Sequence, residues 1–256
     1  MRYTLPAVLV RTYIHIPGIT PEVEVSLWRQ GAIDWDTLIA TPHQWHLPEP
    51  YRSAILIGVE RSQQALEEGD YAYFATRLHP SEHWRAYDEY RHDTAFLDIE
   101  TDGTTTITII GVYDGEEVYQ FVQGENLHEF PDFIREFSMI VTFNGVHFDL
   151  PMIYRQFPPL AFDQLHLDLC PTLRRVGLRG GLKRIEQVLG LPRDPDLEGM
   201  DGRDAIRLWQ AYRVGHESAL ETLLRYNRED IVNLKPLANL AYTRLREKLW
   251  RKATEI

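Results

Sequence analysis

Three short segments of the chain carry acidic side chains of the kind that bind metal ions. Asp98 and Glu100 follow an apolar, strand-like run, and residues two apart on a strand point to the same face. Asp149 ends a second acidic segment. Tyr226 and Asp230 lie four residues apart in a helical pattern, so they share one face of a helix. Four carboxylates held close together repel one another strongly unless cations neutralise them.

The chemistry that suits such a cluster is phosphoryl transfer. Ligand sets made only of oxygen favour Mg²⁺ or Mn²⁺. Two such ions about 4 Å apart can clamp the attacking and leaving oxygens of an in-line displacement at phosphorus. Each segment alone is weak evidence, because an Asp-x-Glu pair follows many strands and Asp149 could be a helix N-cap. Their occurrence together predicts a two-metal nuclease with Asp98, Glu100, Asp149 and Asp230 as ligands.

Length and composition are those of an ordinary globular protein. The 256 residues are enough for one large domain, or for a catalytic domain with a smaller companion. A single cysteine, Cys170, excludes an internal disulfide framework and fits a reducing, cytoplasmic compartment. No apolar run approaches the roughly 20 residues of a membrane span, so we expect no membrane insertion and no signal peptide.

The net charge of −11 argues against general coating of nucleic acid, which needs extended basic surfaces. It does not exclude a nuclease, because catalytic carboxylates add to the negative count. A basic segment stands out within the acidic chain, opposed by one acid, Glu186. It is a candidate strip for phosphate contacts, although a solvated helix face is an equal alternative. Its members are Arg174, Arg175, Arg179, Lys183, Arg184 and Arg193.

The first 92 residues are expected to form a small, mostly helical region. Helices are predicted at residues 22–30, 34–38 and 53–68, and four tryptophans (Trp28, Trp35, Trp45 and Trp84) are expected to anchor its core. The turn at residues 16–19 resembles part of a helix-hairpin-helix, a DNA-backbone binder. The second glycine of that motif is Thr20 here and no lysine follows it, so a structural cap is favoured over a DNA clamp.

From Thr94 onward the pattern becomes α/β. It predicts a mixed five-stranded sheet flanked by helices. Asp114-Gly115 is a strong hairpin signal between the second and third strands, and Trp209 is expected to pack one of the later helices. The predicted strands are 94–100, 104–113, 117–122, 139–143 and 164–169, and the predicted helices are 125–137, 148–157, 181–189, 202–212 and 217–249.

This order of elements and motifs resembles the ribonuclease H-like fold and, within it, the DEDD exonucleases. Asp98 and Glu100 match the first motif, Asp149 the second and Asp230 the third. Tyr226 matches the tyrosine of the DEDDy branch, since a histidine branch would place His at position 225, which is arginine.

Two narrower resemblances support this reading. The segment 144–151 is similar to the proofreading domains of family B polymerases. The stretch 94–242 resembles the YprB-type ribonuclease H-like proteins, including its 180–183 and 201–203 segments.

The sequence pattern predicts a helical region at residues 1–92, and the resemblance implies a ribonuclease H-like exonuclease domain at 93–256. The same resemblance implies a 3′-to-5′ exonuclease that holds two Mg²⁺ or Mn²⁺ ions and acts on single-stranded or frayed DNA or RNA. Tyr226 would orient the attacking water, because a phenol with a pKa of about 10 is a poor base at neutral pH. Two other functions stay open: a binding module that recruits nucleic acid or a protein partner with little hydrolysis, and an endonuclease of the same fold.

The resemblance also suggests substrate contacts. Thr101 and Asn144 are candidates for the terminal nucleotide. Independently of the resemblance, the basic segment makes Arg174, Arg175 and Lys183 the candidates for phosphate contacts. Phe148 is a candidate to stack on a base, with the core role that phenylalanines more often have as the alternative.

Overall fold

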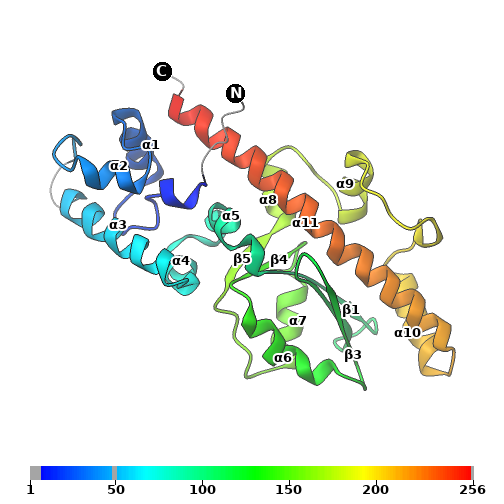
Figure 1. Cartoon of the computed structure of the whole chain (residues 1–256). Helices are drawn as coiled ribbons and strands as arrows, with labels where there is room; N and C mark the ends of the chain where they lie inside the picture. The colour runs from blue at the N-terminus through cyan, green and yellow to red at the C-terminus, as the bar shows by residue number, and fades with distance from the viewer. Residues whose placement is uncertain (1–6, 48–50, 255–256) are drawn as a thin grey trace. The chain divides into compact units, whose positions relative to one another are not determined.

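The computed structural model describes residues 7–47 and 51–254 (Figure 1). The chain divides into two compact units. The first consists of the chain up to Arg91, a short segment at Asp163–His166, and the residues from Tyr242 onward. The second consists of His92–Phe162 and Leu167–Ala241.

The first unit is helical, as the sequence predicts, and local signals account for its helix ends. Thr20 caps α1 by accepting a hydrogen bond from the Val23 N–H, and Gly31 ends that helix at a φ of +104°. Asp34 caps α2 in the same way, with 2.8 Å between its Oδ1 and the Thr37 nitrogen. The α-helices are α1 (Pro21–Gln30), α2 (Trp35–Ala40), α3 (Tyr51–Glu67), α4 (Tyr71–Arg77) and α5 (Tyr87–Tyr90), with 3₁₀ turns at Leu9–Arg11 and Pro80–Ala86.

Four tryptophans lie in the core of this unit, which confirms the prediction for Trp28, Trp35, Trp45 and Trp84. The turn at residues 16–19 packs into the same core: a Cβ at Gly58 of α3 would lie 2.6 Å from the Ile16 side chain. Within the described residues, the element directly before the turn is the 3₁₀ turn Leu9–Arg11 rather than an α-helix.

His15 is a buried imidazole that should make the stability of the protein depend on pH. Its Nε2 lies 2.6 Å from the Ser62 Oγ, and no described group pairs with its Nδ1. Burial, helped by the charges of Arg85 and Arg77, lowers the pKa of His15 to about 3. The unfolded chain has a histidine pKa of about 6.5. Between this pH and about 3, the unfolded chain therefore binds a proton at His15 that the folded chain does not bind.

We expect this contribution to stability to be complete above pH 6.5 and to be lost as the pH falls from there toward 3. Between pH 7.0 and 5.5, the variant His15→Asn should lose about 1 kcal/mol less unfolding free energy than the parent protein. Urea unfolding at the two pH values measures this difference. The matched control is His79→Asn, because His79 is exposed, and it should behave as the parent does. Equal pH dependence in His15→Asn and the parent would contradict the assignment.

Most of a five-stranded sheet, in the order β3-β2-β1-β4-β5, belongs to the second unit. β1 pairs antiparallel with β2 and parallel with β4, and β2 pairs antiparallel with β3. The mixed five-stranded sheet of the prediction is therefore confirmed. The strands are β1 (Thr94–Thr101), β2 (Ile107–Tyr113), β3 (Val118–Val122), β4 (Met139–Thr142) and β5 (Leu165–Asp168).

The helices of this part of the chain are α6 (Phe130–Phe133), α7 (Asp149–Gln156), α8 (Leu169–Arg175), α9 (Leu182–Leu189), α10 (Gly202–Arg213) and α11 (Glu217–Thr254). The helical segment predicted at 125–137 is confirmed over residues 127–136, although not as one continuous α-helix. The segment forms α6 between two 3₁₀ turns, Leu127–Glu129 and Ile134–Glu136. Pro131 explains the break, because it lacks the N–H that a continuous helix would donate one turn back. The sequence patterns also did not predict α4, α5 or α8.

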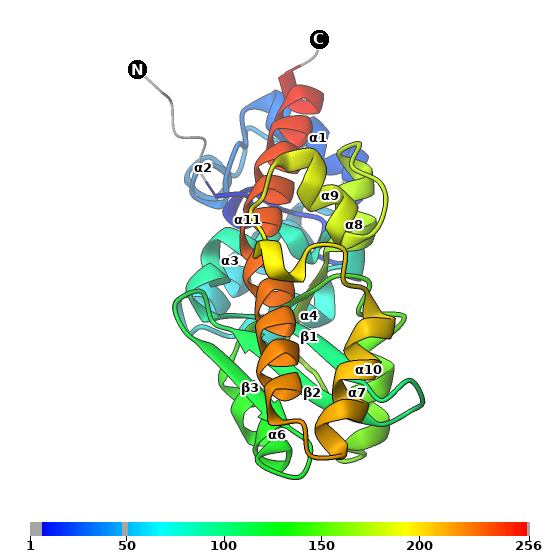
Figure 2. The ribbon, with the colours of Figure 1, turned by 90° about the vertical axis from the view of Figure 1, so that its right-hand side faces the viewer.

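Side chains alternate across β1 and so sort into two layers. Leu97 and Ile99 enter one apolar core with Ile153 of α7 and residues around α6. A second core joins Ile109 and Val122 of the sheet to α10 and α11, and it contains Trp209, as predicted. Figure 2 shows α10 and α11 on one face of the sheet and α6 and α7 on the other. Asp98 and Glu100 alternate with Leu97 and Ile99, so they point to the face that α11 covers.

Across residues 7–47 and 51–254, no helix combines the length and the apolarity that crossing a bilayer requires.

Candidate metal centre

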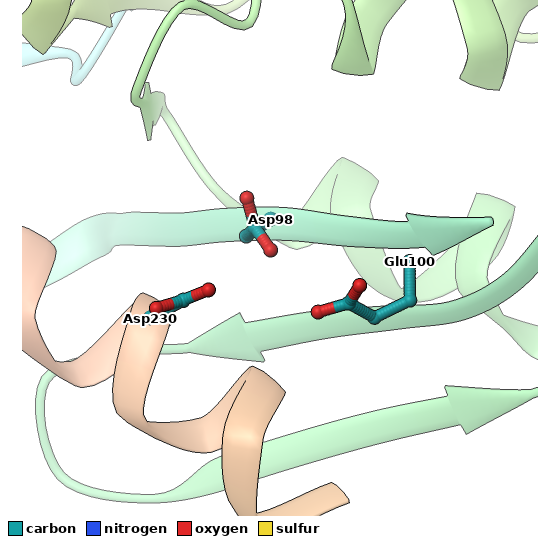
Figure 3. Close-up of side chains that lie close together, drawn as sticks. All are labelled: Asp98, Glu100 and Asp230. Carbon is teal, nitrogen blue, oxygen red and sulfur yellow. The ribbon is translucent and has the colours of Figure 1, made fainter. Parts of the chain in front are cut away.

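β1 and α11 bring three carboxylates together (Figure 3). Asp98 and Glu100 project from the strand, and Asp230 projects from the helix. One oxygen from each lies within 4.8 Å of the others. Glu100 and Asp230 are buried, and Asp98 is partly exposed. A hard divalent cation fits this set, because all the donor atoms are carboxylate oxygens within reach of one ion.

Asp149, at the start of α7, stands beside this group rather than within it. Its side chain is 2% exposed, and the backbone of Ile99, between the two acids of β1, gives it a hydrogen bond. No described group pairs with its buried Oδ1. Its negative charge raises the pKa of both Asp98 and Glu100. Asp149 therefore acts electrostatically on Asp98 and Glu100, and its Oδ1 has no hydrogen-bond partner among the described residues.

The pKa values of the four acids show how unfavourable their charges are without a cation. Burial, followed by repulsion from Asp149, Asp230 and Glu100, raises the pKa of Asp98 well above its usual range. Burial and the charge of Asp230 do the same for Glu100. Burial raises the pKa of Asp149 to about 7 and also raises that of Asp230. A bound divalent ion would relieve this repulsion, so the residues fit a metal centre.

Tyr226 lies one helical turn before Asp230, and its hydroxyl is held in place. The Lys183 Nζ of α9 donates to the Tyr226 oxygen at 2.5 Å and lies 4.2 Å from the ring centroid. Lys183 also donates to the Met200 carbonyl. Burial, with the charges of Asp230 and Glu100, raises the pKa of Tyr226 further above its usual value. The hydroxyl therefore stays protonated at neutral pH, which fits a positioning role and not that of a base.

Arg193 belongs to the site, which the sequence patterns did not predict. Its guanidinium makes two bonds to Glu186 of α9, at 2.6 Å and 3.0 Å, and an ion pair with Asp230. Glu186 is itself buried and accepts a bond of 3.0 Å from the Asn233 Nδ2. Arg193 is thus an internal counter-ion, and not a free member of a phosphate strip. Nothing local in the sequence indicates this pairing, because 37 residues separate Arg193 from Asp230.

A cleft of about 340 Å³ lies over the cluster. The first turns of α9 and α10 form part of its wall, so backbone N–H groups and basic side chains stand beside the acids. Such a mixture suits a phosphodiester next to a cation. The lining residues are Asp98, Phe143, Gly181, Leu182, Lys183, Arg184, Asp201, Gly202, Tyr226 and Asp230.

The other candidate substrate residues lie outside this lining. Thr101 ends β1 just after an irregularity in its register with β2. Asn144 has a φ of +65°, and its N–H donates to Asp168 Oδ1 at 2.8 Å. Arg174 and Arg175 are exposed at the end of α8. Phe148 is 47% exposed, so the alternative of a core role is wrong for it.

A mixed sheet in this strand order, with clustered acids on its central strand and on a late helix, defines a ribonuclease H-like protein with a candidate metal site. Residues 95–242 match the family model described as RNase_H superfamily, and the chain belongs to this superfamily. Its members are generally nucleases that use divalent metal ions. A comparison with curated proteins finds no match.

Proposed function

We propose that this protein is a metal-dependent 3′-to-5′ exonuclease of the DEDDy type, similar to the YprB-type proteins, acting on single-stranded or frayed nucleic acid. The observation that carries the proposal is the group of three carboxylates within 4.8 Å of one another beside the cleft. Asp98, Glu100, Asp149 and Asp230 are the proposed ligands of two Mg²⁺ or Mn²⁺ ions. When bound, the ions would stabilise the negative charge that develops on the reacting phosphate.

The remaining residues have proposed roles around that centre. Because the Lys183 Nζ donates to the Tyr226 oxygen, the hydroxyl hydrogen of Tyr226 is free to donate elsewhere. We assign Tyr226 the orientation of the attacking water.

On the substrate side, Phe148 has the exposure needed to stack on a base. Thr101 and Asn144 are proposed to contact the terminal nucleotide, and Arg174, Arg175 and Lys183 the phosphates. The domain boundary near residue 92 and a cytoplasmic location stay predictions.

Removal of divalent metal should abolish hydrolysis. We expect 5′-labelled single-stranded DNA or RNA to shorten to a ladder in Mg²⁺ or Mn²⁺, and to stay intact in EDTA, because the acids then have no cation to hold. The measurement is gel electrophoresis of both nucleic acids over time, with a 3′-labelled copy that should release labelled mononucleotide at once.

Other outcomes separate the alternatives. Discrete internal products would identify an endonuclease of the same fold. Binding of the oligonucleotides without cleavage in either metal would contradict the nuclease proposal and would favour a binding module. Cleavage that persists in EDTA would contradict the role of the metal.

A further inference from the structure

Asn227 lies between Tyr226 and Asp230 in the sequence. Its buried side-chain amide contacts Asp98 of the candidate metal centre. Its side chain is 0% exposed although it lies on α11. Its Nδ2 donates to the Asp98 Oδ2 at 3.5 Å, and its Oδ1 accepts from the Gln120 Nε2 at 3.0 Å. Asn227 therefore connects Gln120 of β3 to Asp98 of β1 by two side-chain hydrogen bonds.

The direction of this link is fixed by the backbone. The Gln120 Nε2 also donates to the Leu224 carbonyl at 2.8 Å. A carbonyl only accepts, so Gln120 must present its NH₂ group to both neighbours. Asn227 then has to turn its oxygen toward Gln120 and its own NH₂ group toward Asp98. The order of donors runs from Gln120 through Asn227 to the carboxylate, and Asp98 receives an N–H as an acceptor.

Gly111 makes room for this arrangement. It is the residue of β2 directly opposite Asp98 in the antiparallel register. A Cβ at position 111 would lie 2.0 Å from the Asn227 Oδ1 and 2.8 Å from its Cγ. The φ of Gly111 is not in the left-handed region, so the backbone does not require glycine here. Glycine is required at position 111 because the Asn227 side chain approaches so closely.

We propose that the Gln120–Asn227 pair positions the carboxylate of Asp98 for cation binding and that Gly111 exists at its position to admit that pair. This inference rests on the proposed function in treating Asp98 as a ligand. The physical reason is that Asp98 faces three other acids, whose repulsion favours any rotamer that turns its oxygens away. A fixed donor opposes that rotation. Groups that orient metal ligands in this way typically change metal affinity by about 10- to 100-fold when removed.

The test is Mn²⁺ binding to the purified 256-residue chain without nucleic acid, measured by calorimetry or by the loss of the free-ion EPR signal. Asn227→Ala should raise the Mn²⁺ dissociation constant by about 10- to 100-fold, with the fold retained by circular dichroism. Gln120→Glu should also weaken binding, because a carboxylate at 120 accepts from Asn227 and turns the Asn227 oxygen toward Asp98. The control is Asn239→Ala, an exposed asparagine on the same helix, which should bind as the parent does.

A pair of variants tests the role of Gly111. Gly111→Ala should weaken Mn²⁺ binding and lower the melting temperature, because Asn227 is displaced. In the double variant with Asn227→Ala, the two small side chains fit, so the melting temperature should recover while Mn²⁺ binding stays at the Asn227→Ala level.

Unchanged Mn²⁺ affinity in folded Asn227→Ala and Gln120→Glu would overturn the inference. The inference would also be overturned if the loss of Mn²⁺ affinity in the double variant equalled the sum of the losses in Gly111→Ala and Asn227→Ala. These outcomes are separate from the nuclease proposal: weakened Mn²⁺ binding in protein that cleaves no oligonucleotide would support this inference and contradict that function. Parent-like Mn²⁺ affinity in an Asn227→Ala variant that still cleaves oligonucleotides would contradict this inference and support the nuclease proposal.

Discussion

Replacing Asp98 with asparagine is expected to abolish metal-dependent hydrolysis and to make the metal-free protein more stable. Loss of a ligand removes several kcal/mol of charge stabilisation, which corresponds to a rate lower by about 10³-fold or more. Stability moves the other way because burial and three neighbouring acids raise the pKa of Asp98 in the folded protein. An acid whose folded pKa is raised costs stability at any pH above its unfolded pKa, and asparagine removes that cost.

Oligonucleotide cleavage in Mn²⁺ and thermal melting in EDTA at pH 7.5 measure the two effects. Asp102→Asn is the matched control, since Asp102 lies four residues further on and accepts hydrogen bonds from the Thr104 N–H and Oγ1. Those bonds lower the pKa of Asp102, so its variant should keep its activity without gaining stability. Cleavage at the parent rate by Asp98→Asn would remove the basis for the proposed centre. A lower melting temperature in EDTA would show that repulsion does not dominate there.

Removing only the hydroxyl of Tyr226 should slow the chemical step and leave metal binding unchanged. We expect Tyr226→Phe to lower the single-turnover rate by about 10²-fold, the size of effect that misplacement of a reacting group produces. The phenylalanine ring keeps the packing with Ile109 and Leu223 in the core, so the fold should hold. Because the pKa of Tyr226 is raised above its usual value, the parent rate should also show no tyrosine titration up to pH 9.

Single-turnover kinetics and Mn²⁺ calorimetry on the same preparations separate the rate from the binding. Tyr212→Phe is a suitable control. Tyr212 lies on α10, and its hydroxyl donates to Glu125 at 3.1 Å and not to one of the clustered acids. Weaker Mn²⁺ binding with an unchanged rate in Tyr226→Phe would place the hydroxyl in the metal centre rather than at the reacting water.

The acids could be located from the sequence because their spacing reflects regular structure. Asp98 and Glu100 alternate with Leu97 and Ile99, and a strand with one apolar face must turn the other residues the opposite way. Tyr226 and Asp230 follow the helical spacing in the same manner. The strands of the sheet were predicted for the same reason, since β-branched runs separated by turn residues carry a local signal.

The counter-ion and the supporting amides could not be located in this way. Arg193 reaches Asp230 only because the segment after α9 folds back toward α11, and no spacing rule describes such a loop. Its residue type and the neighbouring arginines favoured a solvent-facing or phosphate-facing role. Asn227 stands inside the third motif, but only the geometry shows that its side chain is buried against Gly111 and reaches Asp98.

Arg193 already supplies a positive charge to Asp230, so binding of a cation by this acid would be an exchange of partners rather than a simple addition. The guanidinium also makes two bonds to Glu186, which would keep it nearby if its link to Asp230 opened. The free energy of that opening is subtracted from the attraction between the ion and the acids. The ion pair would therefore raise the free concentration of divalent cation needed to fill the site, and the arginine-paired form would persist below that concentration.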